Sequence, residues 1–108
     1  MKVAAVQMAV KILETQHNLA RVIAKMEEAS RAGAKIVAFP ECALTGYCFT
    51  SREEAWPIAE TVPGPSTETL AEAAKRLDCT AIVGMLEREG DVLYNSAAVV
   101  DPTGILGT

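Results

Sequence analysis

Short apolar runs alternate along the chain with segments in which apolar residues recur every three or four positions. Continuous apolar runs of this length are typical of strands that are buried on both faces. These runs occupy residues 3–8, 34–39, 79–86 and 92–100. The helical period is clearest between the first two runs, where it predicts a helix over residues 15–32. Its apolar stripe consists of Leu19, Val22, Ile23 and Met26.

The ends of this first helix carry residues that commonly cap helices. Thr15 or Asn18 is suited to cap the start, and Gly33 supplies the left-handed residue that often follows a helix. Strand, helix and strand then form a βαβ unit with a right-handed crossover and parallel strands. Since parallel strands end at the same edge of a sheet, the end of the first strand should lie beside Glu41.

The second half of the chain predicts a further helix and an antiparallel hairpin. The helix spans residues 67–77, with Ser66 as its N-cap. Residues 87–91 form a polar connection between the last two apolar runs. Residues 101–104 have the composition of a β-turn, after which another strand begins at Ile105.

A long connection over residues 42–65 separates the second strand from the second helix. Connections longer than about 12–15 residues are uncommon in compact domains unless they serve a function. Residues 51–56 have the pattern of a short helix capped by Ser51, and Trp56 is suited either to a lid or to packing.

Composition limits the classes of protein that fit this chain. Its 108 residues are enough for one domain, and 50% hydrophobic with 22% charged residues is typical of a globular protein. A net charge of −4 without any basic cluster gives no support for binding nucleic acid or an anionic membrane. The apolar runs are too short to span a bilayer, and no signal-peptide pattern opens the chain. Three cysteines, an odd number, indicate reduced thiols in a cytoplasmic protein.

Few residues in the chain are suited to catalysis. His17, the single histidine, is expected to be solvated at the start of the first helix, which leaves nucleophilic triads without a base. No cluster of His, Cys, Asp or Glu has metal-ligand spacing. A glycine-rich turn after the first strand is also missing, so neither a metal nor a dinucleotide cofactor is expected. A catalytic base in this chain would therefore be a carboxylate.

Glu41 is the carboxylate in the most informative position. It follows Pro40 at the carboxyl end of a buried strand, where open α/β sheets place their ligand crevice. Either it is a general base, or it is a strand-end glutamate paired with a lysine or with backbone N–H groups. Cys42 is expected to face away from Glu41, because successive side chains of an extended segment alternate. Cys48 and Cys79 have the positions of a loop residue and a core residue.

Three stretches carry a family resemblance over essentially the whole chain. The first is Val3-Ala4-Ala5-Val6-Gln7-Met8. The second is Phe39-Pro40-Glu41 followed by Leu44-Thr45-Gly46-Tyr47. The third is Gly84-Met85-Leu86-Glu87 with Tyr94-Asn95-Ser96-Ala97 and the turn at Gly104. In order and spacing they resemble the first strand, the glutamate signature and the following hairpin of the nitrilase superfamily of carbon–nitrogen hydrolases.

The resemblance implies an α/β fold, the αββα sandwich, of which residues 1–108 form the first half. It also implies hydrolysis of a non-peptide C–N bond in an amide, carbamoyl or nitrile substrate by a Glu-Lys-Cys set through a thioester. Glu41 takes the role of general base, and Tyr47 lies near the substrate pocket. Asn95 and Ser96 are expected to be structural.

The resemblance also implies that two catalytic residues of the hydrolase lie outside this segment. The lysine and the nucleophilic cysteine follow after Thr108 in the family, so residues 1–108 are expected to be the N-terminal part of a single domain, inactive and poorly soluble alone. No cofactor is implied. The partner is a small-molecule substrate, and homo-oligomers built by sandwich packing are expected.

Two alternatives stay open at this stage. A non-catalytic module that reuses the same scaffold for binding or assembly would need neither the lysine nor the cysteine. An unrelated flavodoxin-like domain would instead continue with parallel βα units after Leu86, against which the polar residues 87–91 argue.

Overall fold

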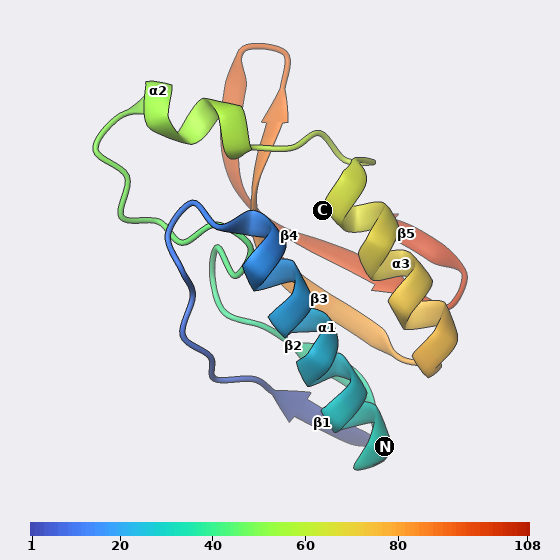
Figure 1. Ribbon diagram of the computed structural model, residues 1–108. Coiled ribbons are helices and arrows are strands. Elements are labelled where there is room, and N and C mark those ends of the chain that lie inside the picture. Colours follow the sequence, from blue (N-terminus) through green and yellow to red (C-terminus); the bar gives the residue numbers. More distant parts are fainter.

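Five strands form one mixed sheet whose spatial order follows the sequence, in a computed structural model that describes residues 1–108 (Figure 1). The strands are β1 (Lys2–Ala5), β2 (Ala34–Ala38), β3 (Thr80–Glu89), β4 (Val92–Asp101) and β5 (Gly104–Gly107). β1, β2 and β3 pair in parallel, as the predicted βαβ unit requires. β3, β4 and β5 pair antiparallel, which rules out the flavodoxin-like alternative.

Two long helices, α1 (Thr15–Arg31) and α3 (Pro65–Leu77), lie side by side over one face of the sheet (Figure 1). A short helix, α2 (Arg52–Ala55), continues into a 3₁₀ helix, η1 (Trp56–Ile58), beside the β3–β4 hairpin. Trp56 packs there, because the guanidinium carbons of Arg52 and Arg88 lie 4.6 and 5.6 Å from the centroid of its ring. The packing role is thus the one that the structure supports.

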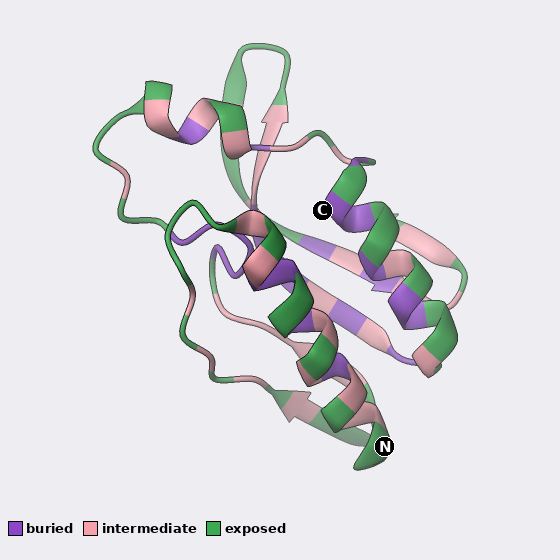
Figure 2. Ribbon diagram, viewed as in Figure 1, coloured by how far each residue is buried: buried purple, intermediate pink, exposed green.

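The hydrophobic core lies between the two long helices and the sheet. Figure 2 shows the buried residues of α1 and α3 on the sides of the helices that face the strands. Leu19, Val22 and Met26 of the predicted apolar stripe are buried in this core. On the sheet, register places the fully buried Val37, Ala81 and Val100 side by side in β2, β3 and β4, so they share the face covered by the helices.

The other face of the sheet carries no long helix (Figure 1). The strand residues that alternate with the core include Ile36, Ile82 and Val99, which are half-buried, and Val3, which is 64% exposed. The protein therefore has one helical layer on one sheet, which corresponds to half of the predicted four-layer sandwich. None of its helices is long and apolar enough to cross a membrane.

The prediction that residues 87–91 are a connection is wrong for residues 87–89, because they pair with residues 92–94 and extend β3 to Glu89. The ends of the other elements differ from the sequence predictions at three places. β1 ends at Ala5 and not at Met8, although Val6 still donates its N–H to the carbonyl of Ala38 at 2.9 Å. The prediction that Thr15 or Asn18 caps α1 is wrong, since Glu14 is the N-cap residue and its side chain makes no capping bond. Gly33 has φ +91°, which confirms its predicted left-handed conformation after α1.

The start of α3 is the third difference. Gly64 is the N-cap residue and Pro65 the first helical residue, so the helix begins two residues before its predicted start at Thr67. Pro is favoured at this position because it has no N–H to leave unpaired. Ser66 lies inside the first turn, where its N–H and hydroxyl both donate to the Glu60 carboxylate, at 2.8 and 2.5 Å. By contrast, Ser51 caps α2 as predicted and accepts from the Glu54 N–H at 3.1 Å.

Candidate functional site

Glu41 lies in a tight turn that begins where β2 ends. Phe39 still donates its N–H to the carbonyl of Ile82 in β3 at 2.9 Å, and after Pro40 the chain leaves the sheet. The carbonyl of Cys42 then accepts from the N–H groups of Thr45 and Gly46, at 3.1 and 2.8 Å. Cys42 itself has φ +46°. The prediction of an extended segment with alternating side chains is therefore wrong, because the backbone turns within one residue of Glu41.

Gly84 of β3 allows this turn to lie directly on the sheet. A Cβ atom at Gly84 would lie 2.4 Å from the carbonyl oxygen of Pro40 and 2.6 Å from the backbone nitrogen of Cys42. Any side chain at this position would push the turn away. The Leu44 N–H also donates to the Gly84 carbonyl, at 3.4 Å. An isolated glycine inside an apolar strand is the sequence signal for such a close approach.

The side chains of Glu41 and Cys42 both reach Asn95 of β4. The Asn95 Nδ2 donates to Glu41 Oε1 at 2.5 Å, and the Cys42 Sγ lies 3.7 Å from Asn95 Oδ1 as a thiol donor. Glu41 is exposed, and neither a lysine nor a backbone N–H bonds to its carboxylate. Within this chain, the partner of Glu41 is therefore a neutral amide and neither of the groups that the alternative expected.

Cys48 and Cys79 occupy the loop and core environments that the sequence predicted. Cys42 and Cys79 are 1% and 2% exposed, and Cys48 is exposed. Burial raises the pKa of the Cys42 thiol, and the adjacent negative charge of Glu41 raises it further. Burial, followed by the charge of Asp78, raises the pKa of the Cys79 thiol as well. Since the thiolate is the reactive form, neither buried cysteine is suited to be a nucleophile.

The loop that follows β1 lies beside the turn that carries Glu41. Leu13 donates its N–H to the Thr45 carbonyl at 3.0 Å. The fully buried Asn18 amide donates to the Leu44 carbonyl at 2.9 Å and also bonds to both backbone groups of Lys11, at 2.7 and 2.9 Å. The prediction that β1 and β2 end at the same edge is confirmed by their parallel pairing, in which Ala5 lies opposite Ala38. Asn18 was missed as a loop anchor, although an asparagine at the border of the apolar stripe is an unusual residue.

Three other residues named from the sequence have different surroundings. The prediction that His17 is solvated is wrong, because its Nε2 is buried without a hydrogen-bond partner. Tyr47 is 65% exposed in the loop after the Glu41 turn, and its place beside a substrate stays a prediction. Ser96 donates its hydroxyl to Glu87 Oε1 at 2.7 Å within the hairpin, which fits its predicted structural role.

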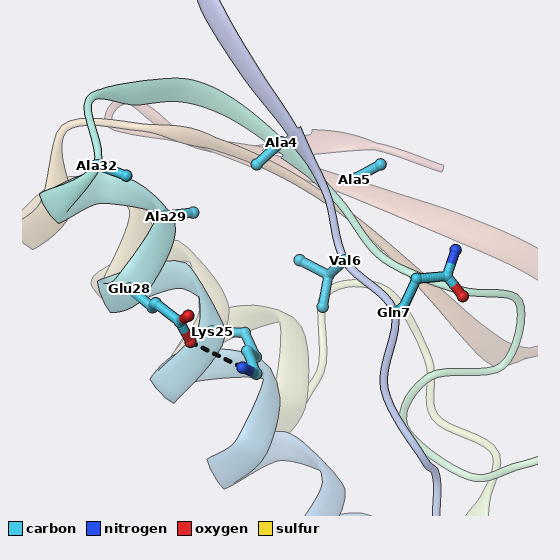
Figure 3. A pocket seen from close by; sticks show the side chains of 8 residues that line it. All are labelled: Ala4, Ala5, Val6, Gln7, Lys25, Glu28, Ala29 and Ala32. Atoms are coloured by element: carbon cyan, nitrogen blue, oxygen red, sulfur yellow. Dashed lines mark hydrogen bonds and ion pairs between the residues drawn. The ribbon is translucent and has the colours of Figure 1, made fainter.

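A shallow cavity of about 270 Å³ lies between α1 and the edge strand β1 (Figure 3). Its lining consists of Ala4, Ala5, Val6, Gln7, Lys25, Glu28, Ala29 and Ala32. The Lys25 ammonium bonds to Glu28 at 2.7 Å, and this hydrogen bond lowers the pKa of the Glu28 carboxyl. The two charged groups of the cavity lining therefore neutralise each other. Glu41 is not part of this lining. No group of three or more His, Cys, Asp or Glu side chains is placed to hold a metal ion.

Comparisons with known proteins show the family to which this chain belongs. The family described as Carbon-nitrogen hydrolase matches residues 2–108. A nitrilase of Pyrococcus abyssi (strain GE5 / Orsay) is 44% identical over 107 residues, which cover 98% of this chain and 41% of that protein. The omega-amidase NIT2 of Bos taurus is 36% identical over 106 residues, covering 97% of this chain and 37% of that protein.

A solved structure shows the same arrangement of elements. The crystal structure of an N-terminal amidase superposes with a TM-score of 0.82 at 30% identity, over 96% of this chain and 26% of that chain. The chain thus spans between 26% and 41% of the length of these relatives. With a family match over nearly all of its residues, the chain belongs to the carbon–nitrogen hydrolases of the nitrilase superfamily.

Proposed function

We propose that this chain supplies the general base, Glu41, of an enzyme that hydrolyses a small amide, carbamoyl or nitrile compound. The observation that carries the proposal is the environment of Glu41. Its carboxylate is exposed at the carboxyl end of β2, and a neutral amide holds one of its two oxygens. The second oxygen makes no hydrogen bond within the chain and is free to accept a proton. This environment suits a base better than an ion pair would, because no fixed cation occupies the carboxylate.

For an amide substrate, the chemistry runs through a cysteine thiol and a lysine ammonium that the family supplies outside residues 1–108. Glu41 takes the thiol proton, and the sulfur attacks the carbonyl carbon, whose oxygen becomes an oxyanion beside the lysine. The oxyanion collapses, the C–N bond breaks, and the nitrogen leaves with the proton that Glu41 returns. The product of this half-reaction is a thioester on the cysteine.

Water completes the reaction. Glu41 takes a proton from water, whose oxygen attacks the thioester carbon, and the C–S bond breaks as the acid is released. The sulfur recovers the proton from Glu41, so the enzyme returns to its starting state with no net change in charge. One carboxylate thus acts as base and then as acid in each half-reaction, which requires an oxygen that is free to exchange protons.

The relatives support amides as the substrate class. They include omega-amidases and an N-terminal amidase solved with an Asn-Glu peptide. In this proposal, residues 1–108 are the N-terminal part of one hydrolase domain and have no activity alone, because neither buried cysteine replaces the missing nucleophile. Homo-oligomers built by packing one complete sandwich on another also belong to the proposal. The open face of this sheet, which carries apolar residues without a helical cover, is then covered by the second sheet of the same sandwich.

Glu41→Gln in the complete protein tests the proposed role. The substitution keeps size and hydrogen bonding but removes the basic oxygen, so kcat for amide hydrolysis should fall about 10²–10⁴-fold with the fold intact. Glu72→Gln, at an exposed glutamate of α3 outside the site, is the matched control and should retain activity. Near-normal hydrolysis by Glu41→Gln would instead favour a binding or assembly module that reuses the scaffold.

A further inference from the structure

We propose that Cys42 and Asn95 act together as positioning residues that fix the orientation of Glu41. This inference rests on the proposed role of Glu41 as general base. A chain of two hydrogen bonds connects the three side chains: the Cys42 thiol donates to Asn95 Oδ1, and Asn95 Nδ2 donates to Glu41 Oε1. The oxygen of the Asn95 amide thus accepts from a donor, and its NH₂ group donates to an acceptor.

The thiol and the carboxylate favour the same orientation of the amide. An asparagine side chain can rotate by half a turn and exchange its oxygen and its NH₂ group. In the reversed orientation, its oxygen would face the Glu41 carboxylate, and two acceptors would meet. A protonated thiol favours the observed orientation because it donates to the oxygen. Burial keeps the Cys42 pKa high, so the thiol retains its proton at neutral pH.

The backbone makes this arrangement possible. Two adjacent residues of an extended segment point to opposite sides and do not reach the same partner. The left-handed conformation of Cys42, at φ +46°, turns the chain so that Glu41 and Cys42 both contact Asn95. Gly84 leaves room for that turn against β3. The turn, the glycine and the amide therefore form one structural unit behind the carboxylate.

The unit restricts the base. Holding Oε1 limits the rotation of the Glu41 side chain and leaves Oε2 as the oxygen without a hydrogen-bond partner in the chain. Cys42 then acts only through Asn95. The buried thiol, which is unsuited to be a nucleophile, thereby acquires a role in the reaction.

The test measures kcat and KM of the complete enzyme carrying substitutions at the two positions. Asn95→Ala should lower kcat about 10–100-fold with little change in KM, as is typical when the partner of a functional group is removed. Asn95→Asp, of nearly the same size, replaces the donor with a carboxylate that repels Glu41, so it should lower kcat at least as much.

The thiol is tested by a matched pair of substitutions. Cys42→Ala removes the donor and should lower kcat by a smaller factor, and Cys42→Ser, which retains a donor, should recover most of that loss. Ser96→Ala is the control on the same strand, since its hydroxyl bonds to Glu87 and not to Glu41. It should leave both kcat and KM unchanged.

The decisive measurement is the double variant Cys42→Ala/Asn95→Ala. If Cys42 acts through Asn95, the double variant should be no slower than Asn95→Ala alone. The inference is overturned if the two losses multiply, or if Asn95→Ala and Asn95→Asp both keep the kcat of the wild type. Either result with an inactive Glu41→Gln variant would leave the proposed function in place. Full activity of Glu41→Gln would overturn the proposed function itself.

Discussion

Gly84→Ala tests whether close contact between β3 and the turn after β2 sets the position of Glu41. The added Cβ would lie 2.4 Å from the Pro40 carbonyl oxygen, 2.6 Å from the Cys42 nitrogen and 2.9 Å from the Glu41 carbonyl carbon. All three are backbone atoms, so no side chain can rotate to relieve the overlap. The turn as a whole must move away from the sheet.

The size of the effect follows from these distances. Ordinary van der Waals contact begins at 3.4 Å, so the turn must move by about 1 Å to accommodate the methyl group. Such forced backbone shifts cost about 1–3 kcal/mol. Loss of the bond from the Leu44 N–H to the Gly84 carbonyl adds about 1 kcal/mol. A displacement of this size near the reacting group also lowers kcat by about 10²-fold.

The assay is denaturant unfolding of the complete protein together with steady-state kinetics. Gly90→Ala is the control, because its Cβ would meet nothing within 4 Å. Its φ of +57° still makes the substitution cost about 1–2 kcal/mol, but at a position remote from the turn. Gly84→Ala should therefore lose both stability and kcat, and Gly90→Ala stability alone. A Gly84→Ala enzyme with the kcat of the wild type would refute the reasoning.

Two further predictions concern the buried polar anchor and the thiols. Asn18→Leu should lower the free energy of unfolding by about 3 kcal/mol, since it removes three hydrogen bonds at 2.7 to 2.9 Å that join Lys11 and Leu44 to α1. Denaturant unfolding measures the loss; Gln16→Ala, at an exposed position of the same helix, is the control, and equal midpoints would contradict the assigned role. Iodoacetamide at pH 8 should modify Cys48 well before Cys42 and Cys79, because burial excludes the reagent and raises the pKa of both buried thiols. Peptide mapping by mass spectrometry measures this order, and equally fast labelling of Cys42 would show that the turn opens in solution.

Local patterns in the sequence were enough to predict most of the secondary structure. The apolar stripe of α1 recurs at the helical period, and β2 and β3 are continuous apolar runs. In each element, many residues therefore indicate the same conformation. The parallel pairing of β1 and β2 follows from the length of the helical crossover. Since Glu41 follows directly after β2 and Pro40, its place at the carboxyl edge of the sheet was predictable as well. The start of α3 was harder to predict, because Gly64 and Ser66, two residues apart, both fit an N-cap.

Contacts between residues distant in sequence were decided only by the tertiary structure. Asn95 contacts Glu41 because the register of β3 and β4 brings Asn95 of β4 to the turn that follows β2. The left-handed conformation of Cys42 was unexpected, since it arises from the packing of the turn on Gly84 and not from a local preference of cysteine. Burial of His17 Nε2 likewise depends on the neighbours of the helix end. The sequence alone thus determined which carboxylate lies at the edge of the sheet, whereas only the assembled sheet decided which side chains bind it. The physical reason is that a periodic pattern shows which face of an element is buried, but not which distant residue that face contacts.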